Sequence, residues 1–158
     1  MIQAAARTSI RPAAPITIRQ VGLEGLPIIA EMNRHLFKED RIINRFDRPD
    51  VIMLTAFVGE QPAGFKVGYG LQNGVYYSAK GGVVETFRRE GIARSLLLDM
   101  MRLARGYGYD RFSFDTFPNV HIGMTLLALN QGFALTGIDY NNGLNGYRFR
   151  FAKILERD

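Results

Sequence analysis

The sequence contains no cysteine and no tryptophan, and only two of its 158 residues are histidines. Without cysteine there is no disulfide framework, no thiolate nucleophile and no cysteine-ligated zinc site. His35 and His121 alone remain as soft metal ligands, so we expect no catalytic metal. No apolar run approaches the roughly 20 residues that a membrane span needs, which predicts that no part of the protein lies in a membrane.

The first 15 residues also lack the continuous apolar segment that a secretory signal contains. They are rich in alanine and include Arg7 and Arg11. We interpret 1–15 as a flexible tail and 16–158 as one domain, because 158 residues suffice for a single core. A transit peptide, which shares this composition, is the weaker alternative. We therefore expect a cytoplasmic protein.

Positive charge is in excess: 20 Lys and Arg against 15 Asp and Glu give a formal net charge of +5 and a pI near 9.7. Such a charge favours an anionic partner, either a nucleic acid or an anionic small molecule. Most arginines are spread along the chain, but Arg88, Arg89 and Arg94 lie close together. This distribution favours a local anion site and makes nucleic acid the less favoured partner.

Apolar periodicity predicts a mixed α/β domain with one largely antiparallel sheet and helices on both faces. The expected strands are 16–19, 51–58, 63–69, 75–84, 111–116, 133–136 and 147–151, and the expected helices are 26–37, 92–105 and 120–130. Asn73-Gly74 is a hairpin signal, and residues 139–146 are read as a long turn. We attribute Gly68, Gly70, Gly81 and Gly82 to strand bulges or close backbone approach, since no helix follows Gly70 as in a dinucleotide-binding loop.

The most informative stretch is Val83–Leu98, an extended apolar run followed by a polar loop and an amphipathic helix. In the loop, the pattern Arg-x-x-Gly-x-Ala places small residues at Gly91 and Ala93. A helix that begins there leaves its first N–H groups without internal partners and exposes its positive dipole end. A phosphate or pyrophosphate is therefore the expected ligand.

This stretch resembles the acyl-CoA loop of the GCN5-related N-acetyltransferases, whose signature is Gln or Arg, two residues, Gly, one residue, then Gly or Ala. Arg88, Gly91 and Ala93 match it, and Gly132-Phe133 matches the end of that family's second motif. The resemblance covers about 16–155 and implies the family's fold, a single three-layer acyl-CoA N-acyltransferase domain. It also implies acetyl-CoA as co-substrate and no metal.

The resemblance implies a set of cofactor-binding residues. The pantetheine arm would bind the backbone of Val83 and Val84 in a gap between two splayed parallel strands. The pyrophosphate would bind backbone N–H groups and nearby charges over Arg88, Arg89, Glu90, Gly91, Ile92, Ala93 and Arg94, and Asn119 would reach the pantetheine. A solvated arginine surface is the alternative for the side chains of Arg88, Arg89 and Arg94.

The candidate catalytic residues are Glu85, Tyr77 and Tyr140. Glu85 stands just before the loop and is a plausible base or water-positioning group, or simply a carboxylate at a strand end. Of Tyr76 and Tyr77, one should face the acceptor cleft. The family's thiolate-protonating tyrosine is replaced by Ala128, and its asparagine by His121, so Thr125, Tyr140 and Tyr147 are weak substitutes for the acid.

We therefore expect an acetyl-CoA-dependent N-acetyltransferase that acts on a primary amine of a small molecule or peptide by direct attack in a ternary complex. An acyl-CoA-binding sensor or regulatory module with little catalysis is the alternative, motivated by Ala128. A basic RNA-binding domain is a third hypothesis, for which the sequence gathers no aromatic and basic face. Dimerisation is common in the family, and the sequence leaves a homodimer open.

Overall fold

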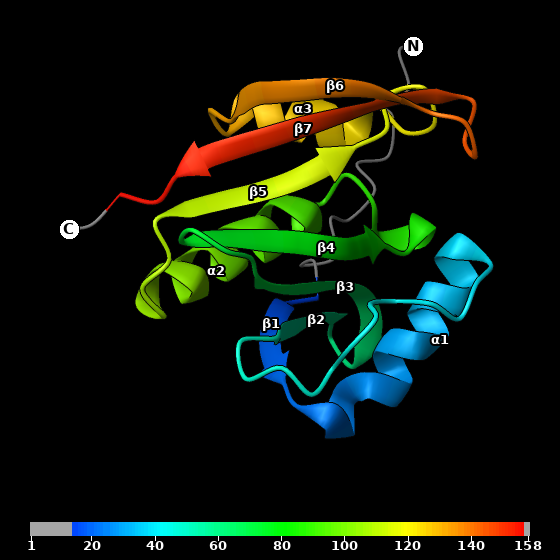
Figure 1. Cartoon of the computed structure of the whole chain (residues 1–158). Coiled ribbons are helices and arrows are strands. Elements are labelled where there is room, and N and C mark those ends of the chain that lie inside the picture. The colour runs from blue at the N-terminus through cyan, green and yellow to red at the C-terminus, as the bar shows by residue number, and fades with distance from the viewer. Residues whose placement is uncertain (1–13, 157–158) are drawn as a thin grey trace, which may run out of the picture.

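The computed structural model describes residues 14–156, so nearly all of the predicted tail, 1–15, lies outside the described residues. Residues 14–156 form one seven-stranded sheet with the strand order β1-β2-β3-β4-β5-β7-β6 and three α-helices (Figure 1). The mixed α/β fold predicted from the sequence is confirmed. No helix in this described part is long and apolar enough to cross a membrane.

The strands and helices follow the chain in the predicted order. The strands are β1 Ile16–Val21, β2 Ile52–Val58, β3 Gln61–Gly70, β4 Val75–Val83, β5 Arg111–Thr116, β6 Ala134–Asn141 and β7 Gly146–Ile154. The α-helices are α1 Leu26–Phe37, α2 Ile92–Gly106 and α3 Gly123–Asn130, with short 3₁₀ turns at Leu23–Gly25 and Glu85–Phe87. All neighbouring strands are antiparallel except β4 and β5, which are parallel. The crossover through α2 joins these two strands, and such parallel connections are right-handed as a rule.

The sheet separates two hydrophobic clusters. The α1 face packs Ile29 and Met32 against Phe65 and Val67 of β3. The opposite face buries the apolar side of α2 and the inner side of α3 against the rest of the sheet, and includes Tyr76. Figure 1 shows α1 on one side of the sheet, with α2 and α3 on the other. The site residues therefore divide by face, and alternate residues along a strand point to opposite faces.

Glycines on β3 allow α2 to pack closely against this strand. A Cβ on Gly64 would lie 3.4 Å from carbons of both Ile92 and Leu96, and a Cβ on Gly68 would lie 2.9 Å from the Met100 sulfur. A register shift after Val67 marks a bulge in the β3–β4 pair. Strand glycines here reflect close approach of a helix and irregular pairing.

The predicted start of the third helix and the predicted long turn were wrong. Helix α3 begins at Gly123, not near Val120, because the N–H groups of Val120 and His121 bond the Phe117 carbonyl in a preceding turn. The predicted long turn 139–146 is short, because β6 continues to Asn141 and β7 begins at Gly146. The pairing of β6 with β7 overrides the turn-like composition of this segment.

Candidate functional site

The parallel strands β4 and β5 pair over only part of their length. Four residue pairs join them, from Val75 with Arg111 to Ser78 with Phe114. Beyond Ser78, β4 continues to Val83 without a β5 partner, while β5 continues to Thr116 bonded to β7 alone. We call this divergence the β4–β5 gap, and its closed end at Ser78 and Phe114 the apex. The sheet thus leaves one edge of β4 free inside the fold.

A bulge on β4 begins where the gap opens. Val67 pairs with Lys80 and Gly68 pairs with Ser78, so Ala79 is the extra residue. The Val84 N–H donates to the Ala63 carbonyl of β3 at 2.8 Å. Because backbone groups alternate along an antiparallel pair, the N–H and C=O of Val83 point the other way, into the gap. Of the two predicted valines, Val83 offers its backbone to the gap, whereas the Val84 N–H is already bonded to β3.

The predicted anion loop lies at the open end of the gap. Arg89 (φ 66°) and Gly91 (φ 83°) both adopt left-handed backbone conformations, and α2 begins immediately afterwards. The Gly91 carbonyl accepts the first helical bond from Ser95 at 3.0 Å, and no side chain caps this helix start. Helix geometry leaves the N–H groups of Ile92, Ala93 and Arg94 without acceptors inside the helix. The loop is exposed, so these donors can bind an anion.

Polar side chains surround the open end of the gap. The Arg88 guanidinium folds back and donates to the Val83 carbonyl at 3.1 Å. The Glu85 carboxylate lies 2.8 Å from Nε2 of His35, on α1. The Glu85 backbone N–H and the His35 ring hold the pKa of Glu85 below its ordinary value. Glu85 is therefore an exposed carboxylate near the anion loop, paired with His35.

Different side chains line the apex on the α1 face. The Tyr77 hydroxyl donates to Oδ2 of Asp115 at 2.9 Å, and Nε of Arg150 donates to Oδ1 of the same carboxylate at 3.1 Å. Tyr69 packs edge-on against Tyr77, with ring centroids 5.8 Å apart. Burial raises the pKa of Tyr77, so its hydroxyl keeps its proton at neutral pH. A buried carboxylate and an aromatic floor therefore lie beside the apex.

Lys66 and Ser78 face the apex from the opposite side of the sheet, and sequence reasoning did not single them out. Nζ of Lys66 donates to Oγ of Ser78 at 2.9 Å and lies 5.8 Å from the centroid of the Phe114 ring. Lys66 and Ser78 are each only 6% exposed. Burial lowers the pKa of Lys66 to about 8. The available signal was a lysine in the middle of an apolar strand, where a charge is rarely buried without a role.

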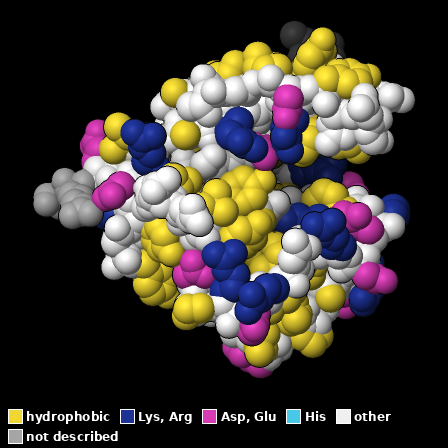
Figure 2. Space-filling view, viewed as in Figure 1, with side chains coloured by type: hydrophobic (Ala, Val, Ile, Leu, Met, Phe, Trp, Pro, Cys, Tyr) yellow, Lys and Arg dark blue, Asp and Glu magenta, His cyan; other side chains and the backbone are white. Residues whose placement is uncertain are grey.

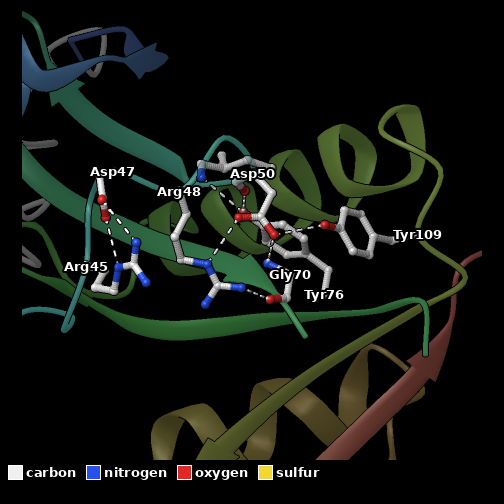
Figure 3. A network of polar contacts seen from close by, with 8 residues as sticks. Arg45, Asp47, Arg48, Asp50, Gly70, Tyr76 and Tyr109 are labelled. Atoms are coloured by element: carbon white, nitrogen blue, oxygen red, sulfur yellow. Dashed lines mark hydrogen bonds and ion pairs between the residues drawn. The ribbon is translucent and has the colours of Figure 1, made fainter. Parts of the chain in front are cut away.

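A polar network holds the long loop between α1 and β2 against the end of β3 (Figure 3). Oδ2 of Asp50 accepts from the Gly70 N–H at 2.8 Å and from the Tyr109 hydroxyl at 3.0 Å. Arg48 bonds the Gly70 carbonyl and pairs with Asp50, and its guanidinium lies 4.5 Å from the centroid of the Tyr69 ring. The loop thus forms one wall beside the aromatic floor.

The other predicted residues have partners elsewhere in the structure or are buried. Tyr140 is half exposed on the edge strand β6, edge-on to Tyr147. Oδ1 of Asn119 accepts from the Tyr147 N–H at 2.9 Å. Ala128 is fully buried in α3, and the Thr125 hydroxyl is bonded to Thr116 at 2.8 Å.

The molecular surface is consistent with a site on the α1 face. Apolar side chains occupy the middle of this view, Lys and Arg side chains lie above and below them, and the surface is hollowed on the right between the upper and lower halves (Figure 2). Some basic side chains form ion pairs with neighbouring acids, as Lys80 does with Glu39 and Arg148 with Asp139. Among residues 14–156, no cluster of three or more His, Asp or Glu side chains could hold a metal ion.

Comparison with known proteins identifies the fold. The family model "Acetyltransferase (GNAT) family" matches residues 25–133. No curated protein sequence matches the chain significantly. Many solved structures match. Arabidopsis thaliana NAA60 in complex with acetyl-CoA is 16% identical over 89% of this chain and 99% of its own, with a TM-score of 0.71. The ribosomal-protein-S18-alanine N-acetyltransferase of Escherichia coli is 12% identical over 91% of this chain and 96% of its own, with a TM-score of 0.77. The IAA acetyltransferase of Bacillus cereus is 19% identical over 89% of this chain and 100% of its own, with a TM-score of 0.66. At identities this low, the structural likeness shows a shared fold and nothing more specific.

Proposed function

Because this chain belongs to the GNAT acetyltransferase family, we propose that it transfers an acetyl group from acetyl-CoA to a primary amine of a small molecule or peptide. The observation that carries the proposal is the β4–β5 gap, which begins at a bulge and opens at the start of α2, a helix N-terminus that no side chain caps. The complex of the Arabidopsis protein with acetyl-CoA supports the choice of acyl donor.

The proposed binding mode follows the free edge of β4. The pyrophosphate binds the N–H groups at the start of α2, with charge from Arg88, Arg89 and Arg94. The pantetheine lies along β4 and bonds the backbone of Val83, and the thioester reaches the apex. The path from the loop to Ser78 is roughly 20 Å at about 3.3 Å per residue. Glu85 and Tyr77 therefore lie at opposite ends of the bound donor.

The proposed chemistry takes place at the apex. The acceptor amine approaches from the α1 face over Tyr69 and Tyr77, in direct attack within a ternary complex. The Asp115 carboxylate lies beside Tyr77 on this face and is held in place by hydrogen bonds from Tyr77 and Arg150. It would orient the amine and take up its proton, while binding of both substrates supplies much of the rate through orientation.

The class of acceptor amine is the most specific part of this proposal. Proteins with this fold include one named for the alanine of a ribosomal protein and one named an IAA acetyltransferase. Fold alone does not choose between such substrates, because function depends on the site. A screen of amines, from free amino acids and polyamines to short peptides with a free N-terminus, is the direct route to the acceptor.

The first experiment measures the melting temperature with and without acetyl-CoA for the wild type, Gly91→Glu and Gly108→Glu. Gly91 and Gly108 flank α2, both have positive φ (83° and 95°), and a Cβ at either would meet no atom within 4 Å. Both variants therefore carry the same strain and added charge, and only Gly91→Glu should lose the shift given by acetyl-CoA. No shift in the wild type would refute the proposal. A shift without acetylation of any amine in the screen would favour the sensor alternative.

A further inference from the structure

Lys66 is a buried cation whose charge is not balanced by a carboxylate. Its Nζ bonds a neutral hydroxyl on Ser78 and lies near the Phe114 ring, and within residues 14–156 no acid forms an ion pair with it. A buried ammonium is costly unless a negative group compensates it during the protein's function. Its position should therefore indicate where a negative charge appears.

The Lys66 side chain crosses from β3 to the apex. Its Cα is opposite Gly81 of β4, and a Cβ on Gly81 would lie 3.4 Å from the Lys66 Cα and 3.5 Å from its Cβ. From there the side chain reaches Ser78, three residues back along β4, and approaches Phe114 on β5. Ser78 and Phe114 are the last residues that pair β4 with β5. The ammonium thus lies behind the strand junction at which the proposed donor ends.

The hydrogen bond between them leaves a proton available on Ser78. An ammonium has three donors and no lone pair, so Nζ donates and Oγ accepts. The hydroxyl hydrogen of Ser78 is then free to point at an acceptor. Donation from a cation makes that hydroxyl a stronger donor than an ordinary serine.

We propose that Lys66 and Ser78 together protonate the thiolate that leaves during acyl transfer. This inference rests on the proposed function and adds an acid to it. The amine nitrogen bonds to the thioester carbonyl carbon and gives a proton to the Asp115 carboxylate, while the C–S bond breaks and its electron pair goes to sulfur. Ser78 Oγ gives its proton to sulfur and receives one from Lys66 Nζ, so the products are the amide, neutral CoA thiol, neutral Lys66 and protonated Asp115. Solvent water then takes the proton from Asp115 and returns one to Lys66.

An acid formed by Lys66 and Ser78 would also take the place of the tyrosine that Ala128 replaces in this chain. Ala128 on α3 carries no donor and is fully buried. The nearest hydroxyl on the same helix, Thr125, is bonded to Thr116. The acid of this chain therefore comes from the sheet, not from α3.

The test needs only CoA and no acceptor amine. The thiol of CoA is titrated in its complex with the protein by following thiolate absorbance against pH. In the wild type, the nearby cation should lower the pKa of the bound thiol by about one unit or more relative to Lys66→Met, and Ser78→Ala should remove part of this effect. Lys80→Met is the matched control, because Lys80 lies two residues beyond Ser78 and pairs with Glu39. It should keep the low thiol pKa.

The outcomes separate the two proposals. If CoA binds the wild type and Lys66→Met equally and the bound thiol has one pKa in both, the acid assignment is wrong and the acetyltransferase proposal stands. If CoA does not bind the wild type, both proposals fail. With an acceptor from the amine screen, Lys66→Met should lower kcat by at least about tenfold at an unchanged KM for acetyl-CoA.

Discussion

Lys66 shows how a single buried charge makes stability depend on pH. Burial lowers its pKa from 10.5 to about 8 in the folded protein, because the charged form is poorly solvated there. Between these two pH values the unfolded chain binds the proton and the folded chain does not. The contribution of Lys66 to the free energy of unfolding therefore rises with pH across this window. Below pH 8 the ammonium is charged in both states, and its burial costs the most stability.

We predict that Lys66→Met is more stable than the wild type at pH 7, by about 2 kcal/mol, because it removes a buried charge without a counter-ion. This advantage should shrink as the pH rises from 8 towards 10.5. Denaturant unfolding of both proteins at a series of pH values measures the difference. Lys38→Met, altered at an exposed lysine, controls for the lost net charge. A difference between Lys66→Met and wild type that stays constant with pH would contradict the prediction.

At the residue scale, the sequence did not predict contacts between side chains that are far apart in the chain and meet only in the folded sheet. The conformation of the loop before α2 could be predicted, because Arg88, Gly91 and Ala93 are close in sequence and depend on local backbone, whereas its binding of an anion stays a prediction. Asp115 and Lys66 could not be assigned, because each depends on a partner many residues away, Tyr77 for one and Ser78 for the other. The bond of Glu85 to His35 on α1 could not be predicted for the same reason, because the two residues are 50 positions apart.

Elements were predictable where local pattern and packing agree. Strand β5 has the predicted bounds, Arg111–Thr116, and α1 ends where its apolar spacing ends. The error at β6 has the opposite cause, since Asp139 and Asn141 are typical of turns but pair with Arg148 and Gly146 of β7. Tertiary pairing there outweighs local preference. The splay of β4 from β5 came from family resemblance, because no local pattern encodes where two distant strands stop pairing.

The loop between α1 and β2 depends on one glycine of β3. A Cβ on Gly70 would overlap both the Tyr109 hydroxyl and a carboxylate oxygen of Asp50, closer than real Cβ contacts allow. Those two atoms are bonded to each other and hold the loop (Figure 3). Because Arg48 of this loop covers Tyr69, a change at Gly70 should reach the proposed acceptor face as well.

We predict that Gly70→Ala lowers the free energy of unfolding by about 3 kcal/mol, because the methyl group displaces Tyr109 or Asp50 and breaks the network. Thermal or denaturant unfolding measures this loss. Gly137→Ala is the matched control, since Gly137 is also a strand glycine and its Cβ would meet only Arg150 Cβ at 3.8 Å. Equal effects of the two substitutions would show that the network contributes little.

At the scale of the whole described chain, residues 14–156, the sheet consists of two halves that meet along a short junction. Strands β1–β4 form one half and β5, β7 and β6 the other, and only four residue pairs join β4 to β5 (Figure 1). Helix α2 packs against β1, β2, β3 and β4. The hydrophobic cluster behind the sheet contains residues of α2 together with Phe112 and Phe114 of β5, so this core also links the two halves. A ligand that bonds the free edge of β4 would in effect replace the missing strand pairing.

We therefore predict that CoA slows hydrogen exchange of the Gly81 and Val83 amides, which point into the gap, by at least about tenfold more than that of residues 75–78. Residues 75–78 already pair with β5 and should gain only the overall stabilisation by ligand, about 2.7 kcal/mol at a CoA concentration 100 times Kd. Exchange followed by NMR with and without CoA gives both values. Gly91→Glu should show neither change, and Gly108→Glu should behave as the wild type. Uniform protection of all β4 amides would place CoA elsewhere on the molecule.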